Sequence, residues 1–335
     1  MKRRITSFSP SKGVLIVVSA LFWLATLIIL AVMLVTEGEN SNEPVYGSLE
    51  GRFESSVTLE HEGEILRYRM NEITNYLIIG VDKTNVTEGS NYRNGGQADF
   101  LVVLAIDRVS RSITPVMLDR DAMVDVQTYG VFGDPSGTRT MQLCLAQSYS
   151  GEKVSGSVNT AQTVESLLKG IDIHHYVVLD MEAIPLINDA IGGVEVTLYD
   201  DFTEFDPTME SGKTMRLMGR QAEFFVRGRM TVADGTNASR MARQQQYLTA
   251  LLTQFRKTVQ GDQAKLNSVL DAAEGHMTSD ALESALLRDV NAYGDYEWNA
   301  LRLLEGEHKI DTYGFAEFWI DDVALNELVA DIWFK

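Results

Sequence analysis

The chain has 335 residues, a formal net charge of -18 and one cysteine, Cys144. A single cysteine excludes an intramolecular disulfide and a cysteine-based metal cluster. The acidic balance argues against nucleic acid as a partner, because most of the surface would repel its phosphates. With this length and 45% hydrophobic residues, the chain can bury a self-sufficient core as one large domain or two small ones.

An apolar segment near the N-terminus indicates where the chain resides. Basic residues precede the apolar run Gly13–Val35, and acidic residues follow it. About 20 apolar residues cross a hydrocarbon core, and the positive-inside rule places the basic flank in the cytoplasm. We therefore predict a cytoplasmic tail (1–12), a signal-anchor transmembrane helix (13–35), an extracytoplasmic linker (36–52) and an extracytoplasmic domain (53–335). A cleaved signal peptide is the alternative, and it also leaves the domain outside.

Strand patterns dominate the first part of the predicted domain. Residues 57–70 alternate between apolar and polar side chains around Glu62-Gly63, which predicts a β-hairpin. Three short apolar runs predict further strands, at 76–81, 100–106 and 113–118.

Helical periodicity follows in the second part. Amphipathic spacing predicts helices at 160–168, 181–191, 237–259 and 324–333, and extended apolar runs predict strands at 175–179 and 194–198. Strands that alternate with helices favour a sheet with helices packed on it, an α/β or α-β-α fold. The composition does not change between 70 and 335, which favours one domain.

Arginines gather in one part of this acidic chain. No lysine lies between Lys213 and Lys257, whereas the same stretch contains Arg216, Arg220, Arg227, Arg229, Arg240 and Arg243. Guanidinium groups bind phosphate oxygens through paired hydrogen bonds and stay charged, so we predict a phosphate or pyrophosphate site. Arg240, Arg243 and Gln244 fall on one face of a predicted helix near its start, where the helix dipole adds to anion affinity. A solvated charged face is the competing interpretation.

Charged residues also stand at the ends of three predicted strands. Asp82 follows the first strand, Asp99 precedes the second, and Arg120 and Asp121 follow the third. If the strands are sheet neighbours, both carboxylates reach one end of the sheet, where Mg²⁺ could bind them together with substrate phosphates. Arg120 is then a candidate phosphate contact at the sheet edge. Structural ion pairs and aspartates that accept loop amides are the competing interpretations.

Seven blocks of sequence, in order and with compatible spacing, resemble the LytR-CpsA-Psr family. They are N-Y-L-I-I-G-V-D (75–82), G-G-Q-A-D (95–99), L-D-R-D (118–121), I-D-I-H-H-Y-V-V-L-D-M (171–181), D-A-I-G-G-V-E-V (189–196), L-M-G-R-Q-A-E-F-F-V-R-G-R (217–229) and S-R-M-A-R-Q-Q (239–245). The resemblance covers essentially residues 70–335. It implies an extracytoplasmic α-β-α sandwich with a central mixed β-sheet, anchored by one transmembrane helix in the cell membrane of a Gram-positive-type bacterium.

The resemblance also implies an activity. Members of the family attach anionic glycopolymers, such as wall teichoic acid or capsular polysaccharide, to peptidoglycan. For this chain it implies a magnesium-dependent phosphotransferase with a polyprenyl-pyrophosphate-linked glycan as donor and peptidoglycan as acceptor. Asp82 and Asp99 would bind Mg²⁺, and Asp99 and Arg120 would be catalytic. The implied pyrophosphate-binding residues are Gln97, Arg227, Arg229, Arg240, Arg243 and Gln244.

Two departures from the family pattern keep other functions open. Gln97 stands where many members have an arginine, and Gln142 stands where many have a lysine. Fewer cations around the pyrophosphate leave two alternatives: a non-catalytic polyprenyl-phosphate-binding envelope regulator, and a hydrolase that transfers the glycan to water. In each case the apolar helices within 160–191 and 245–270 would line a groove for the lipid.

Overall fold

The computed structural model describes residues 57–82, 96–130, 132–151, 154–228, 232, 237–259, parts of 265–281, 293 and 296–335. The predicted cytoplasmic tail, transmembrane helix and linker (1–12, 13–35 and 36–52) lie outside these residues. Within the described part of the chain, no helix is long and apolar enough to span a membrane.

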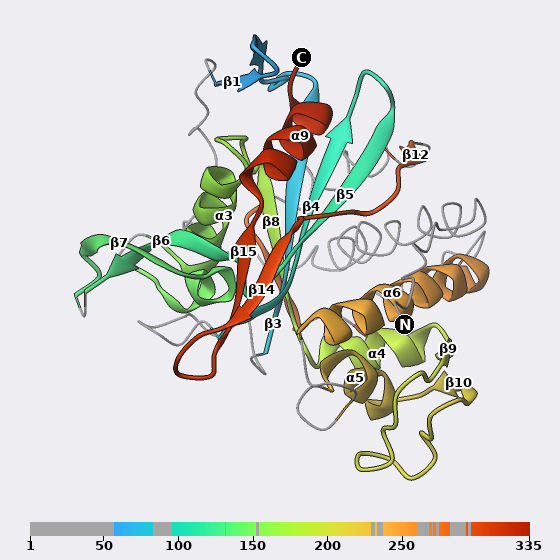
Figure 1. Cartoon of the computed structure of the whole chain (residues 1–335). Helices are drawn as coiled ribbons and strands as arrows, with labels where there is room; N and C mark the ends of the chain where they lie inside the picture. The colour runs from blue at the N-terminus through green and yellow to red at the C-terminus, as the bar shows by residue number, and fades with distance from the viewer. Residues whose placement is uncertain are drawn as a thin grey trace, which may run out of the picture.

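A seven-stranded sheet forms the centre of the fold (Figure 1). Its order is β11 (Met277–Ser279), β8 (His175–Asp180), β3 (Ile73–Val81), β4 (Ala98–Asp107), β5 (Ser112–Leu118) and β12 (Glu297–Trp298), with β13 (Arg302–Leu303) also paired to β5. Strand β3 runs antiparallel to β4 and parallel to β8, and β4 runs antiparallel to β5. The central sheet is therefore mixed, as the family resemblance predicts.

Helices cover both faces of this sheet, which explains why β3 is buried along its whole length. Leu77 and Ile79 face a core that they share with α3 (Gly156–Leu167) and α9 (Asp322–Trp333). Tyr76 and Ile78 face a second core, shared with α4, α5 and α6. Figure 1 shows these two helical layers on opposite sides of the strands. The helices of the second layer are α4 (Ala183–Ala190), α5 (Arg220–Arg227) and α6 (Asn237–Val259).

Four two-stranded ribbons and a short 3₁₀ helix complete the described fold. They are β1–β2 (Thr58–His61 and Glu64–Arg67), β6–β7 (Met123–Tyr129 and Pro135–Gln142), η1 (Leu143–Ser148), β9–β10 (Val194–Thr197 and Thr214–Leu217) and β14–β15 (Gly306–Ile310 and Ala316–Ile320). The predicted hairpin at 57–70 is β1–β2, and its turn residues Glu62 and Gly63 have φ values of 51° and 83°. Positive φ at both central positions is what a two-residue hairpin turn requires.

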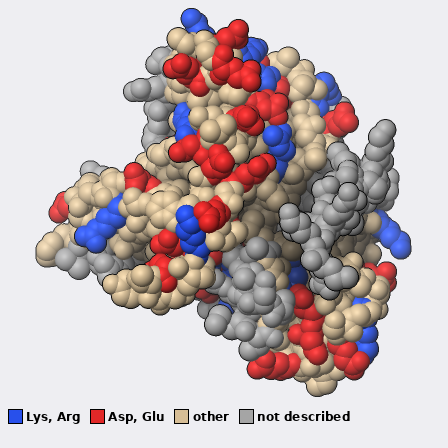
Figure 2. All heavy atoms as spheres, viewed as in Figure 1, with Lys and Arg blue, Asp and Glu red and all other residues tan. Residues whose placement is uncertain are grey.

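Charge is distributed differently on the surface and in the interior. Figure 2 shows acidic and basic side chains interspersed over the visible face. Among the described residues, three arginines and four aspartates are almost completely buried: Arg120, Arg240, Arg243, Asp119, Asp121, Asp180 and Asp280. A buried guanidinium needs a partner, because removing an unpaired charge from water is very costly. Each of these buried charges is therefore expected to have a polar or oppositely charged partner, so their surroundings are candidate sites.

Candidate functional site

The register of the sheet brings three strand ends to one edge. Val81 pairs with Ala98 on the neighbouring strand, and Leu101 pairs with Leu118 on the next. The end of β3, the start of β4 and the end of β5 therefore lie together. This confirms that the strands preceding Asp82, containing Asp99 and preceding Arg120 are sheet neighbours.

Arg120 lies at the centre of a buried polar network at this edge. Its Nη1 donates to Oδ1 of Asp99, and its Nη2 donates to Oε1 of Gln97 at 2.7 Å and to Sγ of Cys144 at 3.0 Å. The Nε atom lies 3.3 Å from Oδ1 of Asp121, a fully buried carboxylate. Bonds on several sides fix the plane of the guanidinium and occupy most of its donors with protein groups.

Gln97 connects Asp82 to this network. The backbone N–H of Gln97 donates to Oδ1 of Asp82 at 3.0 Å, while its side chain accepts from Arg120. Asp82 itself is exposed at the edge of the sheet. The two predicted metal-binding aspartates are thus linked through Gln97 and Arg120: Gln97 bonds Asp82 and Arg120, and Arg120 bonds Asp99.

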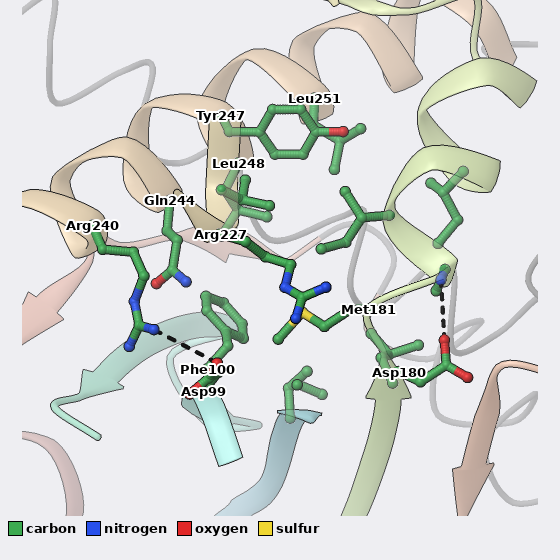
Figure 3. Close-up of a pocket in the computed structure, with 17 residues that line it drawn as sticks. Asp99, Phe100, Asp180, Met181, Arg227, Arg240, Gln244, Tyr247, Leu248 and Leu251 are labelled. Carbon is green, nitrogen blue, oxygen red and sulfur yellow. Dashed lines mark hydrogen bonds and ion pairs between the residues drawn. The ribbon is translucent and has the colours of Figure 1, made fainter. Parts of the chain in front are cut away.

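A second arginine approaches the other carboxylate oxygen of Asp99. Arg240, on α6, places its Nη1 3.6 Å from Oδ2 of Asp99, and it is only 3% exposed. Figure 3 shows this pair at the polar end of a pocket between the helices and the sheet. Asp99 therefore lies between two guanidinium groups, one from β5's end and one from α6. The two guanidinium groups are balanced by the carboxylates of Asp99 and Asp121, so an anionic ligand has to displace a carboxylate from its guanidinium partner.

An apolar cavity begins at this ion-pair cluster. It holds about 910 Å³ of empty space, counted out to its open mouth, and lies between β3, β4 and β8 on one side and α4, α5 and α6 on the other. Most of its lining is aliphatic or aromatic: Ile78, Phe100, Leu179, Met181, Ile184, Ile187, Val226, Tyr247, Leu248 and Leu251. The polar residues Asp99, Arg227, Arg240 and Gln244 also line it. The cavity thus joins a charged end to an apolar body.

Two polar groups of the lining refine this picture. Burial raises the pKa of Tyr247, so its hydroxyl stays neutral and donates to Oδ1 of Asn188 at 3.1 Å. Within the described residues, Oε1 of Gln244 is buried and has no hydrogen-bond partner. A buried amide oxygen without a partner is destabilising. This oxygen can only accept, so a ligand O–H or N–H would satisfy it, whereas a phosphate oxygen would need the Nε2 of the same amide.

Comparison with known proteins identifies the family. A family model described as the LytR_cpsA_psr family matches residues 35–320. The chain belongs to the LytR-CpsA-Psr family. This match begins close to the end of the predicted transmembrane helix and continues through β15.

Several curated proteins are similar to this chain in sequence. Biofilm regulatory protein A of Streptococcus mutans serotype c is 26% identical, over 65% of this chain and 53% of its own length. The polyisoprenyl-teichoic acid–peptidoglycan teichoic acid transferase TagV of Bacillus subtilis is 28% identical, over 53% of this chain and 43% of its own length. TagU of Enterococcus faecalis, which has the same transferase name, is 24% identical, over 78% of each chain. The chain thus spans about half the length of the first two relatives.

Solved structures share the fold. Protein gbs0355 of Streptococcus agalactiae superposes with a TM-score of 0.61 at 20% identity, covering 78% of this chain and 88% of that protein. TagV of B. subtilis gives a TM-score of 0.58 at 20% identity, with 78% and 96% covered. A structure of TagT bound to LI-WTA gives 0.56 at 17% identity, with 83% and 95% covered. These similarities establish the mixed α/β fold of the LytR-CpsA-Psr family for this chain.

The structure does not bring every predicted arginine to the cavity. Arg243 is directed away from it, toward Asp200 at 3.0 Å and the backbone oxygens of Phe225 and Gly228. Arg227 lines the cavity but also forms an ion pair of 2.6 Å with Glu223 on the same helix. Arg229 lies outside the described residues. Arg240 is therefore the predicted arginine whose charge the structure directs most clearly at the polar end.

Two further residues of the network were not assigned as site residues from the sequence. Burial raises the pKa of the Cys144 thiol, although the nearby Arg120 charge opposes this, so the thiol accepts a bond from that arginine as a neutral group. Gln142 does not contact the cavity. Its Nε2 donates to Oδ1 of Asp121 at 3.1 Å and to the backbone oxygen of Ala316 at 2.6 Å. The local sequence M-Q-L-C-L-A gives no signal for either contact, because both depend on chain segments that are distant in sequence.

The donor set at the sheet edge fits Mg²⁺ in kind. Among the described residues, no group of three or more His, Cys, Asp or Glu side chains could hold a metal ion. Mg²⁺ nevertheless binds through one or two carboxylates when phosphates and water complete its shell. Asp82 supplies an exposed carboxylate, and Asp99 supplies one that is now engaged by arginines. The two residues are therefore suited to a metal that arrives with a phosphate ligand.

Proposed function

We propose that this chain is a phosphotransferase that moves an anionic glycopolymer from a polyprenyl-pyrophosphate carrier to peptidoglycan. The single observation behind this proposal is the cavity, whose apolar body ends at Arg240 and at Asp99, the carboxylate that Arg240 and Arg120 share. A polyprenyl pyrophosphate has the same two parts in the same order. The names of TagV and TagU, which describe transfer of teichoic acid from a polyisoprenyl carrier to peptidoglycan, support the proposal.

Each part of the donor then has a place. The polyprenyl chain lies in the apolar body, against the aliphatic side chains of α4 and α6, where burial of its methyl and methylene groups stabilises the complex. The pyrophosphate lies at the polar end, where Arg120, Arg240 and Gln244 can donate to its oxygens. Because these arginines now neutralise Asp99, phosphate oxygens that replace its carboxylate release Asp99 for chemistry.

The transfer itself exchanges one P–O bond for another. The oxygen of a peptidoglycan hydroxyl forms a bond to the glycan-proximal phosphorus, and the bond between this phosphorus and the bridging oxygen breaks. Polyprenyl phosphate leaves with the bonding electron pair, and the hydroxyl proton passes to the carboxylate of Asp99. Arg120 and Arg240 neutralise the charge that develops on the phosphoryl oxygens.

Magnesium and the membrane are also part of the proposal. Asp82 and Asp99 would hold Mg²⁺, which supplies additional positive charge to the phosphates when it is bound. The apolar run 13–35 would anchor the domain on the outer side of the cell membrane, where a polyprenyl carrier is accessible.

Arg240→Ala tests this proposal against a matched control. The control is Arg220→Ala, which makes the same change of charge on α5 at a highly exposed arginine. We expect Arg240→Ala to weaken binding of a lipid-linked pyrophosphate donor by about 10- to 100-fold, the effect of losing a charged hydrogen bond. Arg220→Ala should bind like the wild type. Full-length protein in detergent micelles, with Mg²⁺ and a fluorescent donor, allows both binding and transfer to peptidoglycan to be measured.

The same assay separates the alternatives. Equal donor affinity in both variants would contradict the proposed site. Donor binding without any turnover would instead indicate a polyprenyl-phosphate-binding regulator, and release of free glycan would indicate a hydrolase.

A further inference from the structure

The β14–β15 hairpin is attached directly to the network that holds Arg120. The backbone N–H of Phe318 donates to the oxygen of Asp121 at 2.8 Å, and Phe318 also forms a bridge with Ala122. Gln142 joins the side chain of Asp121 to the backbone of Ala316. In Figure 1 this hairpin runs along the sheet toward the end of β3. The hairpin is therefore a neighbour of the candidate site.

The two faces of this hairpin have different compositions. Phe318 packs into the core beside α9, whereas Trp319, the next residue, is 44% exposed. Trp319 pairs across the hairpin with Glu307, and its Nε1 donates to Glu317 at 2.7 Å. Lys309 lies 2.9 Å from Glu307. The outer face thus presents an aromatic ring surrounded by charged groups.

The tip of the hairpin adds two exposed aromatic rings. Tyr313 is 85% exposed and Phe315 is 64% exposed. Oδ1 of Asp311 accepts the backbone N–H groups of both residues at 2.8 Å, and Gly314 between them has a φ of 88°. The tip is thus a turn stabilised by its own hydrogen bonds, and it exposes two large aromatic rings to solvent. Exposed aromatic groups beside a site mark an interaction surface more often than a packing defect.

The composition and the position of the hairpin identify the kind of ligand. A lipid surface would have to bury Glu307 and Glu317 with the rings, at a large desolvation cost. A sugar chain instead places its C–H faces on aromatic rings and its hydroxyl groups on carboxylates and amines. The hairpin also lies at the polar end of the site, on the face of the sheet opposite the apolar cavity. It therefore lies on the side where a glycan, and not a lipid tail, is expected.

We propose that the outer face and tip of β14–β15 bind the acceptor glycan strand and present its hydroxyl group to the candidate site. This inference rests on the proposed function, because it names the surface that holds the second substrate. The hairpin that would hold the acceptor contacts Asp121 directly and through Gln142, and Asp121 contacts Arg120.

Oligosaccharide binding in the absence of donor tests the surface by itself. The probe is a soluble, peptide-free, β-1,4-linked oligosaccharide of N-acetylated hexosamines, titrated into the full-length protein in detergent micelles. We expect the double variant Tyr313→Ser, Phe315→Ser to weaken binding by about tenfold, from the loss of two aromatic contacts. The control Tyr199→Ser removes an equally exposed ring elsewhere and should bind like the wild type. Donor binding should be unchanged in all three proteins, which separates this test from that of the donor site.

A second measurement distinguishes a glycan surface from a membrane contact. Because Cys144 is buried, a Tyr313→Cys variant can be labelled selectively with a nitroxide on the hairpin tip. In vesicles of phosphatidylcholine and phosphatidylglycerol we expect the label to collide with a water-soluble nickel complex. Protection from that complex with access to bilayer oxygen would overturn the proposal in favour of membrane insertion. Equal oligosaccharide affinity in the double variant and the control would also overturn it.

Discussion

Arg240 and Arg243 lie less than one helical turn apart on α6, yet their guanidinium groups have different neighbours. Arg240 approaches Asp99 at the polar end of the cavity. Arg243 donates to Asp200 and to backbone oxygens at the end of α5, and its guanidinium lies 5.7 Å from the ring centre of Phe202. Arg243 thus joins α6 to α5 and to the segment after β9. The two residues have the same chemistry but serve different parts of the molecule.

Replacing Arg243 by alanine separates these roles. The change would leave Asp200 without its partner and remove the bonds that hold the end of α5, so we expect the free energy of unfolding to fall by about 3 kcal/mol. Urea denaturation measures this loss, and donor titration on the same variant should show a smaller effect than Arg240→Ala. If Arg243→Ala unfolds like the wild type but no longer binds the donor, Arg243 belongs to the pyrophosphate site, as the sequence predicts.

At the residue scale, the sequence identifies the charged residues of the site but not the residues that contact them. Asp99, Arg120 and Arg240 are identifiable from the resemblance, and the structure brings them together. The contacts of Cys144 with Arg120 and of Gln142 with Asp121 cannot be read from the sequence, because the partners lie more than one strand away. Arg240 and Arg243 share a helical face in the periodic pattern, but side chains as long as arginine reach different partners from neighbouring positions.

Elements with strong periodicity are predicted well, and polar elements are not. The strands at 76–81, 100–106 and 113–118 are buried on both faces and appear close to their predicted bounds. The helix at 237–259 has the predicted bounds. Strand β7 (Pro135–Gln142) was not predicted, because its sequence P-S-G-T-R-T-M-Q is polar and largely exposed. Its conformation depends on pairing with β6 and not on its own pattern.

The junction between α4 and β9 offers a test at the scale of elements. Gly193 has a φ of 82°, and a Cβ atom there would lie 2.7 Å from the backbone oxygen of Leu217 on β10. Gly212 has a similar φ of 85° but open space around it. We expect Gly212→Ala to cost about 1 kcal/mol of stability from the backbone conformation alone. Gly193→Ala should cost about 1–3 kcal/mol more, because the methyl group overpacks the junction.

Thermal unfolding of both glycine variants provides the comparison. Equal losses at the two positions would show that β10 moves aside without cost. In that case the junction does not fix α4, one wall of the cavity, as firmly as its close contacts indicate.

In the described part of the molecule, the buried charges are of both signs: four aspartates (Asp119, Asp121, Asp180 and Asp280) and three arginines (Arg120, Arg240 and Arg243). The net charge is -18, but Arg240 is buried in the lining at the polar end of the cavity, and Arg120 is buried beside Asp99, which also lines it. An acidic surface repels anions in general, so an anionic donor depends on this local cluster for its affinity. Salt should therefore affect donor binding less than it affects nonspecific contacts of the surface, because buried pairs are screened weakly.

The stability of the molecule should depend on pH through carboxylates far from the cavity. Burial favours a higher pKa for Asp107, but hydrogen bonds from Ser110, Arg69 and Val109 outweigh it and lower the pKa below its ordinary value. A carboxyl group whose pKa is lower in the folded state stabilises the fold above its unfolded pKa, and this stabilisation is lost as pH falls through the folded value. We expect Asp107→Asn to be less stable than the wild type at neutral pH and to approach it below about pH 4.

Urea denaturation across this pH range measures the difference. The control is Asp134→Asn, at an exposed aspartate on the loop before β7, which should follow the wild type throughout. A constant difference between Asp107→Asn and the wild type at every pH would show that the contribution of Asp107 is not ionic.

The position of Trp333 has a consequence for the order in which the fold forms. This ring is fully buried, and its Nε1 donates to Oδ1 of Asn75 at 2.8 Å across 258 positions of sequence. The backbones of Arg67 and Lys335 also bond to each other. The part of this sheet face that α9, and not α3, covers therefore stays exposed during synthesis until the segment 322–335 has emerged. Contacts this distant form late and slowly, so the newly made chain needs protection from aggregation until α9 has emerged.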